Sequence, residues 1–403
     1  MLPNSLIALI ALAIACYLAL SPRLASSSSW KATLTPLASI MGSGFLVSAP
    51  LLARIVGDLA VGAMVLLLCL AYAVGGAIRF NIEYFEPIEN ERHGPAQILA
   101  FLSRIVLACA YFISVSYYLQ LLAAFSIHLL GIHGADYHQT IPTLLLFWIG
   151  GLGMWRGLGS LEQVERYTVS LNLGMIGALL LALGFYNFEL MATGAWFVDP
   201  NLDALDGRDV RVLLGLLIVV QGFETSRYLG HEHTATERIT TMRRAQLLSA
   251  GIYIFFIALC TPVFRPDLGA DVTAVIEMTR PVASILPLLL GLAAIFSQFS
   301  AAVADTAGAG GLIEELTERR LPIRYAYLAI LVVTVALTWE TNVNEIIAYA
   351  SRAFAAFYAL QCAVASRVAW ENRSVAHRSS RIVGYGFLSA VCLAVFWLGV
   401  PAE

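Results

Sequence analysis

The chain has 403 residues, of which 59% are hydrophobic and 13% are charged, and its formal net charge is −3. Soluble globular proteins carry about 25% charged residues, so this composition excludes a soluble globular protein. Six scattered cysteines exclude a disulfide-rich secreted scaffold, and the slightly acidic net charge argues against nucleic acid as a partner. We therefore expect a helical, multi-pass protein of the cell membrane that is surrounded by the lipid bilayer.

Apolar runs with the length of a membrane-spanning helix, about 20 residues, follow one another along the chain. The first run, residues 3–21, has neither a basic start nor a small-residue cleavage signal, so we expect a retained helix. The twelve expected spans are 3–21, 33–56, 59–79, 97–131, 141–155, 164–188, 210–229, 243–264, 282–308, 323–339, 343–369 and 382–400.

Basic residues predict the orientation of these spans, because Arg and Lys concentrate in cytoplasmic loops. If alternate connections lie on opposite sides, 18 of the 24 basic residues fall on one side and 5 on the other. The side with 18 is expected to be cytoplasmic, which places both chain ends outside the cytoplasm. Four acidic residues on the cytoplasmic side, Glu83, Glu86, Glu89 and Glu91, are interpreted as mostly solvated, with Glu83 paired to Arg79.

The spans after the first one divide into two blocks of five and one final helix. Because five is odd, the second block enters the membrane from the opposite side, as in an inverted repeat. The predicted fold is an all-α integral membrane protein of about 12 transmembrane helices, a 5+5 inverted repeat with one extra helix at each end. The predicted units are residues 1–32 (extra helix and linker), 33–188 (first repeat), 189–369 (second repeat with its leading extracellular loop) and 370–403 (accessory helix).

Each block opens on a helix that glycine and polar residues interrupt at mid-span, namely IMGSGF at 40–45 and QGFETSR at 221–227. An unwound stretch frees backbone carbonyls for cations and points half-helix N-termini at anionic groups. We therefore predict that a solute binds between the two breaks. The candidate substrate-binding residues are Ile40, Met41, Gly42, Ser43 and Gly44 in the first break, and Gln221, Gly222, Phe223 and Glu224 in the second.

Few carboxylates lie inside expected spans, and an ionisable residue in a span indicates function, which applies above all to Glu224 and Asp305. Glu224 is predicted to act in the substrate or ion pathway; the alternative is a structural role, either pairing with Arg227 or capping a half-helix. Asp305 is predicted to bind a coupling ion or a proton, because oxygen ligands suit a hard cation such as Na⁺ and a buried carboxyl can hold a proton. The alternative for Asp305 is contact with cytoplasmic water. The candidate coupling residues are Asp305, Ser297, Ser300, Thr306 and Glu224, with a possible Na⁺ site near Ser297 and Asp305.

Three segments resemble the amino acid–polyamine–organocation (APC) transporter superfamily. They are TPLASIMGSGFLVSAPLLARIVGDLAV at 35–61, LLIVVQGFETSRYLGHEHTATERITTMRRAQ at 216–246 and GLIEELTERRLPIRYAYLAI at 311–330. They are similar to that family's first core helix, its sixth core helix and the loop after its eighth, and they stand in the right order.

The resemblance implies the leucine-transporter-type fold, with alternating access. It implies that the long third core helix lines the site, which adds Tyr117 and Gln120 as substrate-binding candidates. It also implies that the helix of Asp305 and the first break together hold the coupling cation. Some proton-coupled members carry a Lys in the fifth core helix, and the matching position in this chain is Asn172.

We therefore expect a secondary active transporter for a small organic solute, an amino acid or related amine, coupled to H⁺ or Na⁺. One alternative is a transporter of inorganic cations on the same fold, and another is a non-transporting membrane sensor or assembly partner. The sequence contains no catalytic constellation, so we do not expect an enzyme. We also expect no cofactor apart from the coupling ion.

Overall fold

The computed structural model describes residues 2–90, 93–131, 137–156, 159–198, 206–230, 233–264, 271–318 and 320–401. Every regular element within these residues is a helix, which confirms the all-α prediction. The α-helices are α1 (Asn4–Leu20), α2 (Pro22–Ser26), α3 (Ser28–Val56), α4 (Ala60–Tyr84), α5 (Pro95–Leu130), α6 (Tyr137–Arg156), α7 (Gly159–Ala192), α8 (Gly207–Leu214), α9 (Ala235–Cys260), α10 (Ala274–Thr279), α11 (Leu286–Leu316), α12 (Ile323–Glu340), α13 (Val343–Glu371) and α14 (Arg378–Leu398). The 3₁₀ segments are η1 (Gly57–Leu59), η2 (Glu86–Ile88), η3 (Leu217–Val220), η4 (Phe223–Leu229) and η5 (Thr261–Val263).

Eight segments of the described chain are long and apolar enough to cross a membrane, and one of them, residues 28–84, contains both α3 and α4. These segments support a multi-pass membrane protein. Helix α1 has 17 residues and is slightly shorter than the helices in this group. The exact number of spans, the inverted repeat and the orientation of the chain ends stay predictions.

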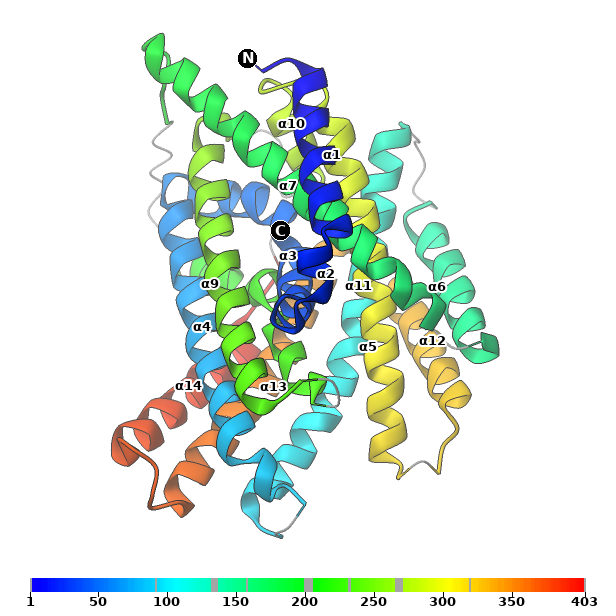
Figure 1. Ribbon diagram of the computed structural model, residues 1–403, viewed down its shortest axis with the longest axis vertical. Helices are drawn as coiled ribbons and strands as arrows, with labels where there is room; N and C mark the ends of the chain where they lie inside the picture. Colours follow the sequence, from blue (N-terminus) through cyan, green and yellow to red (C-terminus); the bar gives the residue numbers. More distant parts are fainter. Residues whose placement is uncertain are drawn as a thin grey trace.

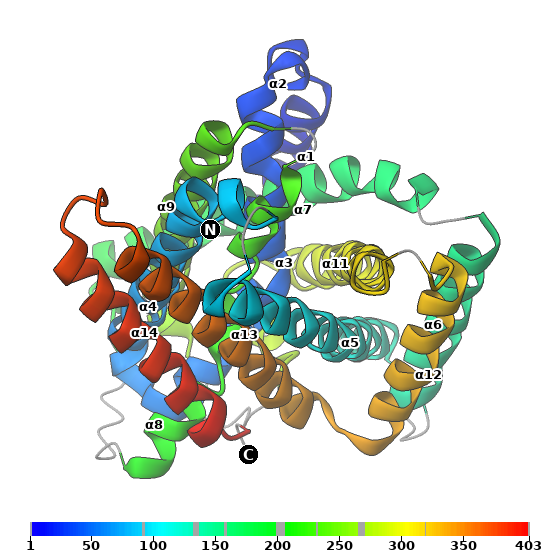
Figure 2. The ribbon, with the colours of Figure 1, turned by 90° about the horizontal axis from the view of Figure 1, so that it is seen from below.

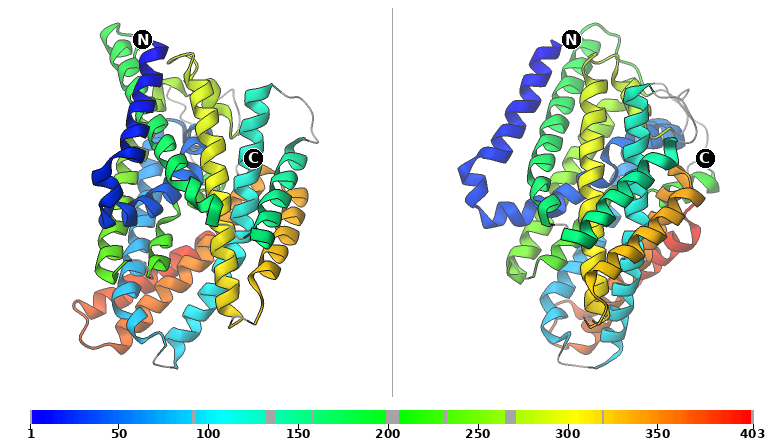
Figure 3. Two further views of the ribbon diagram at one scale, coloured as in Figure 1. Left: turned by 45° about the vertical axis from the view of Figure 1, so that its right-hand side comes forward. Right: turned by 90° about the vertical axis from the view of Figure 1, so that its right-hand side faces the viewer.

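Helix α5 lies at the centre of the bundle, where it packs against α11 and α13 (Figures 1 and 2). Helices α6 and α12 pack against each other at one edge, and α14 packs along α13 at another (Figure 2). Figure 3 shows α1 on the outside of the bundle, beside α7. Glycine allows the α1–α7 contact, since a Cβ atom at Gly174 would lie 2.9 Å from the backbone nitrogen of Ala15.

Both predicted breaks are present, and the expected span at 210–229 is not one continuous helix. That segment consists of α8, η3 and η4, which are short pieces separated at residues 215–216 and at residues 221–222. In α3 the helix is interrupted at Gly44, whose backbone angles are φ 176° and ψ 15°. The glycine and polar residues at these points explain the interruptions, because they weaken a continuous helix.

Candidate functional site

The two breaks touch each other at glycines. A Cβ atom at Gly44 would lie 2.7 Å from Cγ1 of Val219 and 2.8 Å from its Cα, so the first break packs directly on η3. Gly222 has φ +115°, and a Cβ atom there would lie 2.7 Å from the backbone nitrogen of Ile40. Both glycines are therefore required by close approach, and Gly222 also by its left-handed backbone. We call this contact the break junction.

Tyr253 of α9 ties the break junction together. The single proton of its buried hydroxyl is shared between two acceptors, the carbonyl of Ile40 at 3.0 Å and the carbonyl of Val219. Carbonyls freed by unwinding need such donors, since water does not reach them in a membrane. The ring of Phe45 packs edge-on against Tyr253, with their centroids 5.2 Å apart. The sequence pattern did not identify Tyr253 because it lies far from both breaks in the chain.

Glu224 is almost fully buried and caps the start of η4. Its Oε2 atom accepts the backbone N–H of Gly222 at 3.0 Å and the hydroxyl of Tyr358 at 2.8 Å. The ring of Phe223 stacks on Tyr358 at a centroid distance of 5.2 Å. The half-helix cap that the sequence left open as an alternative is therefore present, whereas Arg227 makes its contacts elsewhere. On the other side of the break, Gln221 donates to the hydroxyl of Tyr118 at 3.0 Å.

Helix α11 holds the first break through an amide. The side chain of Gln298 donates to the carbonyl of Gly42 at 3.0 Å, and both residues are buried. One position earlier, the hydroxyl of Ser297 accepts from the amide of Asn172 on α7 at 3.3 Å. Amide N–H groups thus donate to a carbonyl of α3 and to a hydroxyl of α11.

A cavity of about 400 Å³, which we call the central cavity, lies beside the break junction. Its wall includes the Asp305 carboxylate, which also hydrogen-bonds the hydroxyl of Ser114 on α5. The walls combine hydroxyl groups, tyrosine rings and small apolar side chains from α3, α5, α7, η4 and α11. The lining residues used below are Ser39, Ala38, Tyr111, Tyr228, Ser297, Ser300, Ala301 and Asp305.

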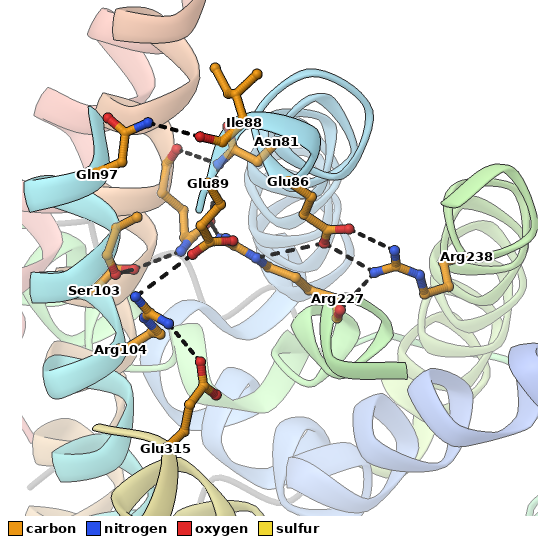
Figure 4. Close-up of polar contacts among 12 residues, drawn as sticks. Asn81, Glu86, Ile88, Glu89, Gln97, Ser103, Arg104, Arg227, Arg238 and Glu315 are labelled. Atoms are coloured by element: carbon orange, nitrogen blue, oxygen red, sulfur yellow. Dashed lines mark hydrogen bonds and ion pairs between the residues drawn. The ribbon is translucent and has the colours of Figure 1, made fainter. Parts of the chain in front are cut away.

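A second cavity of about 580 Å³ shares the residues Tyr111, Tyr228, Ala307 and Gly308 with the central cavity. It lies toward the end of the bundle that holds the α4–α5 and α11–α12 connections, which we expect to be cytoplasmic (Figure 1). Its charged side chains alternate in sign and form a chain of ion pairs that we call the charge network (Figure 4). In order, the members are Glu315, Arg104, Glu89, Arg227, Glu86 and Arg238.

The interpretation of the acidic residues after α4 as mostly solvated is wrong for two of them. Glu86 and Glu89 have side chains that are only 23% and 19% exposed, and both pair with arginines from distant elements. Arg79 donates to Gln246 and to a backbone carbonyl rather than to Glu83. Glu91 lies outside the described residues.

The structure brings part of the predicted site together. Ser297, Ser300 and Asp305 line the central cavity, whereas the hydroxyl of Thr306 donates to a carbonyl of its own helix. Ile40, Met41, Gly42 and Gly44 lie at or near the break junction rather than on the cavity wall, and the side chain of Ser43 lies outside the described part.

On the third core helix, Tyr117 is fully buried beside Tyr118, and Gln120 donates to Ser116 and Thr341. Neither of these candidates lines the central cavity. The roles predicted for all of these residues stay predictions. The sequence reading did not single out Tyr111, Ser114, Gln298 or Tyr358, because partners that are distant in the chain define their positions.

A family model for APC superfamily transporters matches residues 22–399, which is most of the chain. The chain belongs to the APC superfamily of transporters. This confirms the resemblance carried by the three motifs.

Individual relatives agree with this family assignment. A protein of Aquifex aeolicus, described as uncharacterized, is 43% identical over 362 residues, which is 88% of each chain. Among solved structures, a manganese transporter of Eremococcus coleocola has a TM-score of 0.56 at 13% identity, with 94% of this APC chain and 90% of that chain covered. MhsT in complex with L-phenylalanine has a TM-score of 0.51 at 14% identity, with 92% and 98% covered. These structures show that this APC protein has the leucine-transporter-type fold.

Proposed function

We propose that this chain is a secondary active transporter that moves an amino acid or related amine through the central cavity by alternating access, coupled to protons. The observation that carries the proposal is the central cavity itself. Its 400 Å³ lie within the range of small-molecule sites, and a carboxylate stands on its wall beside the break junction.

The chemistry of the wall fits an organic ammonium. Asp305 supplies a negative charge in a site of low dielectric, where an ammonium group is its natural partner. The hydroxyls of Ser39 and Ser300 offer hydrogen bonds to a solute's polar atoms, and Ala38 and Ala301 offer apolar contact. Because Ser39 lies next to the break junction, any movement of the two half-helices against each other would change the contacts of a bound solute.

The contacts around the first break favour protons over Na⁺ as the coupling ion. A cation between α3 and α11 would need the carbonyl of Gly42 and the hydroxyl of Ser297 as ligands. Both oxygens accept hydrogen bonds from amides, those of Gln298 and Asn172, so one lone pair on each oxygen is already engaged and is not offered to Na⁺. We propose Glu224 as the proton carrier, because its carboxylate caps the half-helix and would change its hydrogen bonds when protonated.

An inorganic cation is the second candidate solute. Asp305 and the hydroxyls of Ser297 and Ser300 are oxygen ligands on one wall, and the fold also occurs in a manganese transporter. The size and partly apolar character of the cavity favour the organic solute, since a bare ion needs oxygen ligands on all sides.

A thermal-stability screen of the purified protein against single amino acids, polyamines, NaCl and MnCl₂ tests the proposal. A solute present at 100 times its Kd is expected to stabilise the folded protein by about 2.7 kcal/mol. We expect this shift with at least one amino acid or amine. A shift with Mn²⁺ or Na⁺ alone would favour the inorganic alternative, and no shift with any amino acid or amine would contradict the proposal.

A further inference from the structure

Segment η4 contacts helix α13 through two hydrogen bonds, and the residues that form them are three positions apart on both segments. Glu224 accepts from Tyr358 at 2.8 Å, and three residues later Arg227 donates to Gln361, which is three residues after Tyr358. A 3₁₀ segment has three residues per turn, so its residues i and i+3 lie on one face. Residues i and i+3 of an α-helix are also neighbours. The carboxylate of Glu224 and the guanidinium of Arg227 are therefore held by one face of α13.

Gln361 is fixed from several directions. It is fully buried, and its amide donates to the hydroxyl of Ser103 at 2.8 Å. Its side-chain oxygen accepts from Asn81 at 3.0 Å as well as from Arg227, and its backbone carbonyl accepts from Asn81 at 2.9 Å. Any shift of η4 that moves Arg227 must therefore break its hydrogen bond to Gln361, which cannot follow. Breaking a hydrogen bond in a buried site costs free energy.

The outer links of the charge network are tight. Arg238 donates to both carboxylate oxygens of Glu86, at 2.6 and 3.0 Å, and Arg104 pairs with Glu315 at 2.6 Å. Figure 4 shows that the arginine between these two pairs comes from η4.

The three inner links of the charge network are looser, and the first of them joins Arg104 to Glu89 at 3.9 Å. Arg227 lies 3.4 Å from Glu89 and 3.9 Å from Glu86, although its side chain is only 7% exposed. Arg238 also donates to the backbone carbonyl of Arg227 at 2.7 Å, so the network holds η4 by its main chain too. Arg227 is thus the position at which a small shift of η4 would divide the charge network into two halves.

We propose that Gln361 is a positioning residue that links the charge state of Glu224 to the charge network at the end of the second cavity. Neutralising Glu224 weakens two of its hydrogen bonds, the one that caps η4 and the one to Tyr358, and η4 shifts. Arg227 then loses its contacts with Gln361 and with the carboxylates of Glu86 and Glu89. The second cavity then opens. The inference rests on the proposed function only for the role of Glu224 as proton carrier. The titratable side chains around Glu224 are Asp305, Tyr111, Tyr118, Tyr228 and Tyr358.

Hydrogen exchange of the purified protein without solute tests this link. The backbone amides of Ile88 and Glu89, which close turns to Phe85 and Glu86, report on opening of the charge network. We expect Glu224→Gln, which mimics the protonated carboxyl, to raise exchange in a peptide covering residues 85–90 by about fivefold or more. In a Gln361→Met background the same substitution is expected to change exchange by less than about twofold, because coupled sites are non-additive.

A matched control uses a second buried glutamine that accepts from an arginine. Gln246 of α9 accepts from Arg79 and lies outside η4, so Gln246→Met should leave the fivefold response to Glu224→Gln intact. If Gln361→Met does not fold, Tyr358→Phe removes the other bond with little change of volume and should also abolish the response. A response that persists in Gln361→Met or Tyr358→Phe, or no response to Glu224→Gln alone, would overturn the proposal. Exchange needs neither a solute nor a gradient, so the result is independent of whether the amine proposal holds.

Discussion

The Asp305→Asn variant is expected to fold normally but to lose high-affinity solute binding and transport. Asparagine keeps an oxygen that can accept the hydrogen bond from Ser114, so the α5–α11 contact should persist. The lost charge leaves an ammonium unpaired in a buried cavity, which costs about 2–5 kcal/mol. This corresponds to a loss of affinity of at least about 30-fold. The measurement is solute uptake in proteoliposomes, together with the stability shift of the purified protein.

Glu314→Gln is a matched control for Asp305→Asn. Glu314 lies on the same helix but lines neither cavity, so we expect its substitution to leave affinity within about twofold. If both variants bound the solute with wild-type affinity, the Asp305 carboxylate would not be the binding partner of the solute.

The Gly222→Ala variant is expected to destabilise the protein strongly. Gly222 has φ +115°, which strains a residue with a Cβ atom by about 1–3 kcal/mol. The added carbon would lie 2.7 Å from backbone atoms of Ser39 and Ile40, which adds about 1–3 kcal/mol of overpacking. The expected loss is therefore about 2–6 kcal/mol, measured as a lower midpoint of thermal unfolding in detergent.

Gly251→Ala serves as the control for this glycine. Nothing lies within 4 Å of a Cβ atom at Gly251, which stands inside α9. Because alanine favours a helix interior by about 0.5–1 kcal/mol, this variant should be neutral or slightly stabilised. Equal stability of the Gly222→Ala and Gly251→Ala proteins would show that the two breaks do not pack as tightly as the geometry requires.

The positions of the breaks could be predicted from the sequence because their cause is local. Glycine and polar residues inside an apolar run weaken a helix wherever it packs, and the interruptions occur at Gly44 and around Gly222 as expected. Three of the predicted coupling residues on α11, namely Ser297, Ser300 and Asp305, line the central cavity together because their spacing is that of one helix face. Ser297 and Asp305 are separated by eight residues, which places them on one broad face of a helix.

The partners of these residues could not be predicted, because contacts between distant segments determine them. The sequence offered two nearby partners for the Glu224 carboxylate, Arg227 and the half-helix backbone. In the structure the carboxylate bonds the backbone and also Tyr358 of α13, which is distant in the chain. Glu86 and Glu89 follow a span and resemble ordinary loop residues. Only the folded bundle brings three arginines from α5, η4 and α9 to within ion-pair distance of them.

In the function proposed above, the break junction would link solute binding to movement of the half-helices. The half-helices on either side of Gly44 and Gly222 meet each other, and Tyr253 bonds both of them. Under the proposed function, a solute in the central cavity would touch this junction through Ser39, so its binding free energy would favour one arrangement of the half-helices.

Uptake of a labelled amine or amino acid into proteoliposomes, driven by an imposed gradient, tests the central claim most directly. The solute is the one that gives the stability shift, and the gradients compared are an inward proton gradient and an inward Na⁺ gradient of equal size. We predict accumulation with the proton gradient, no added accumulation with the Na⁺ gradient, and no accumulation by the Asp305→Asn protein. Accumulation that follows the Na⁺ gradient alone, or that is unchanged in Asp305→Asn, would contradict the account.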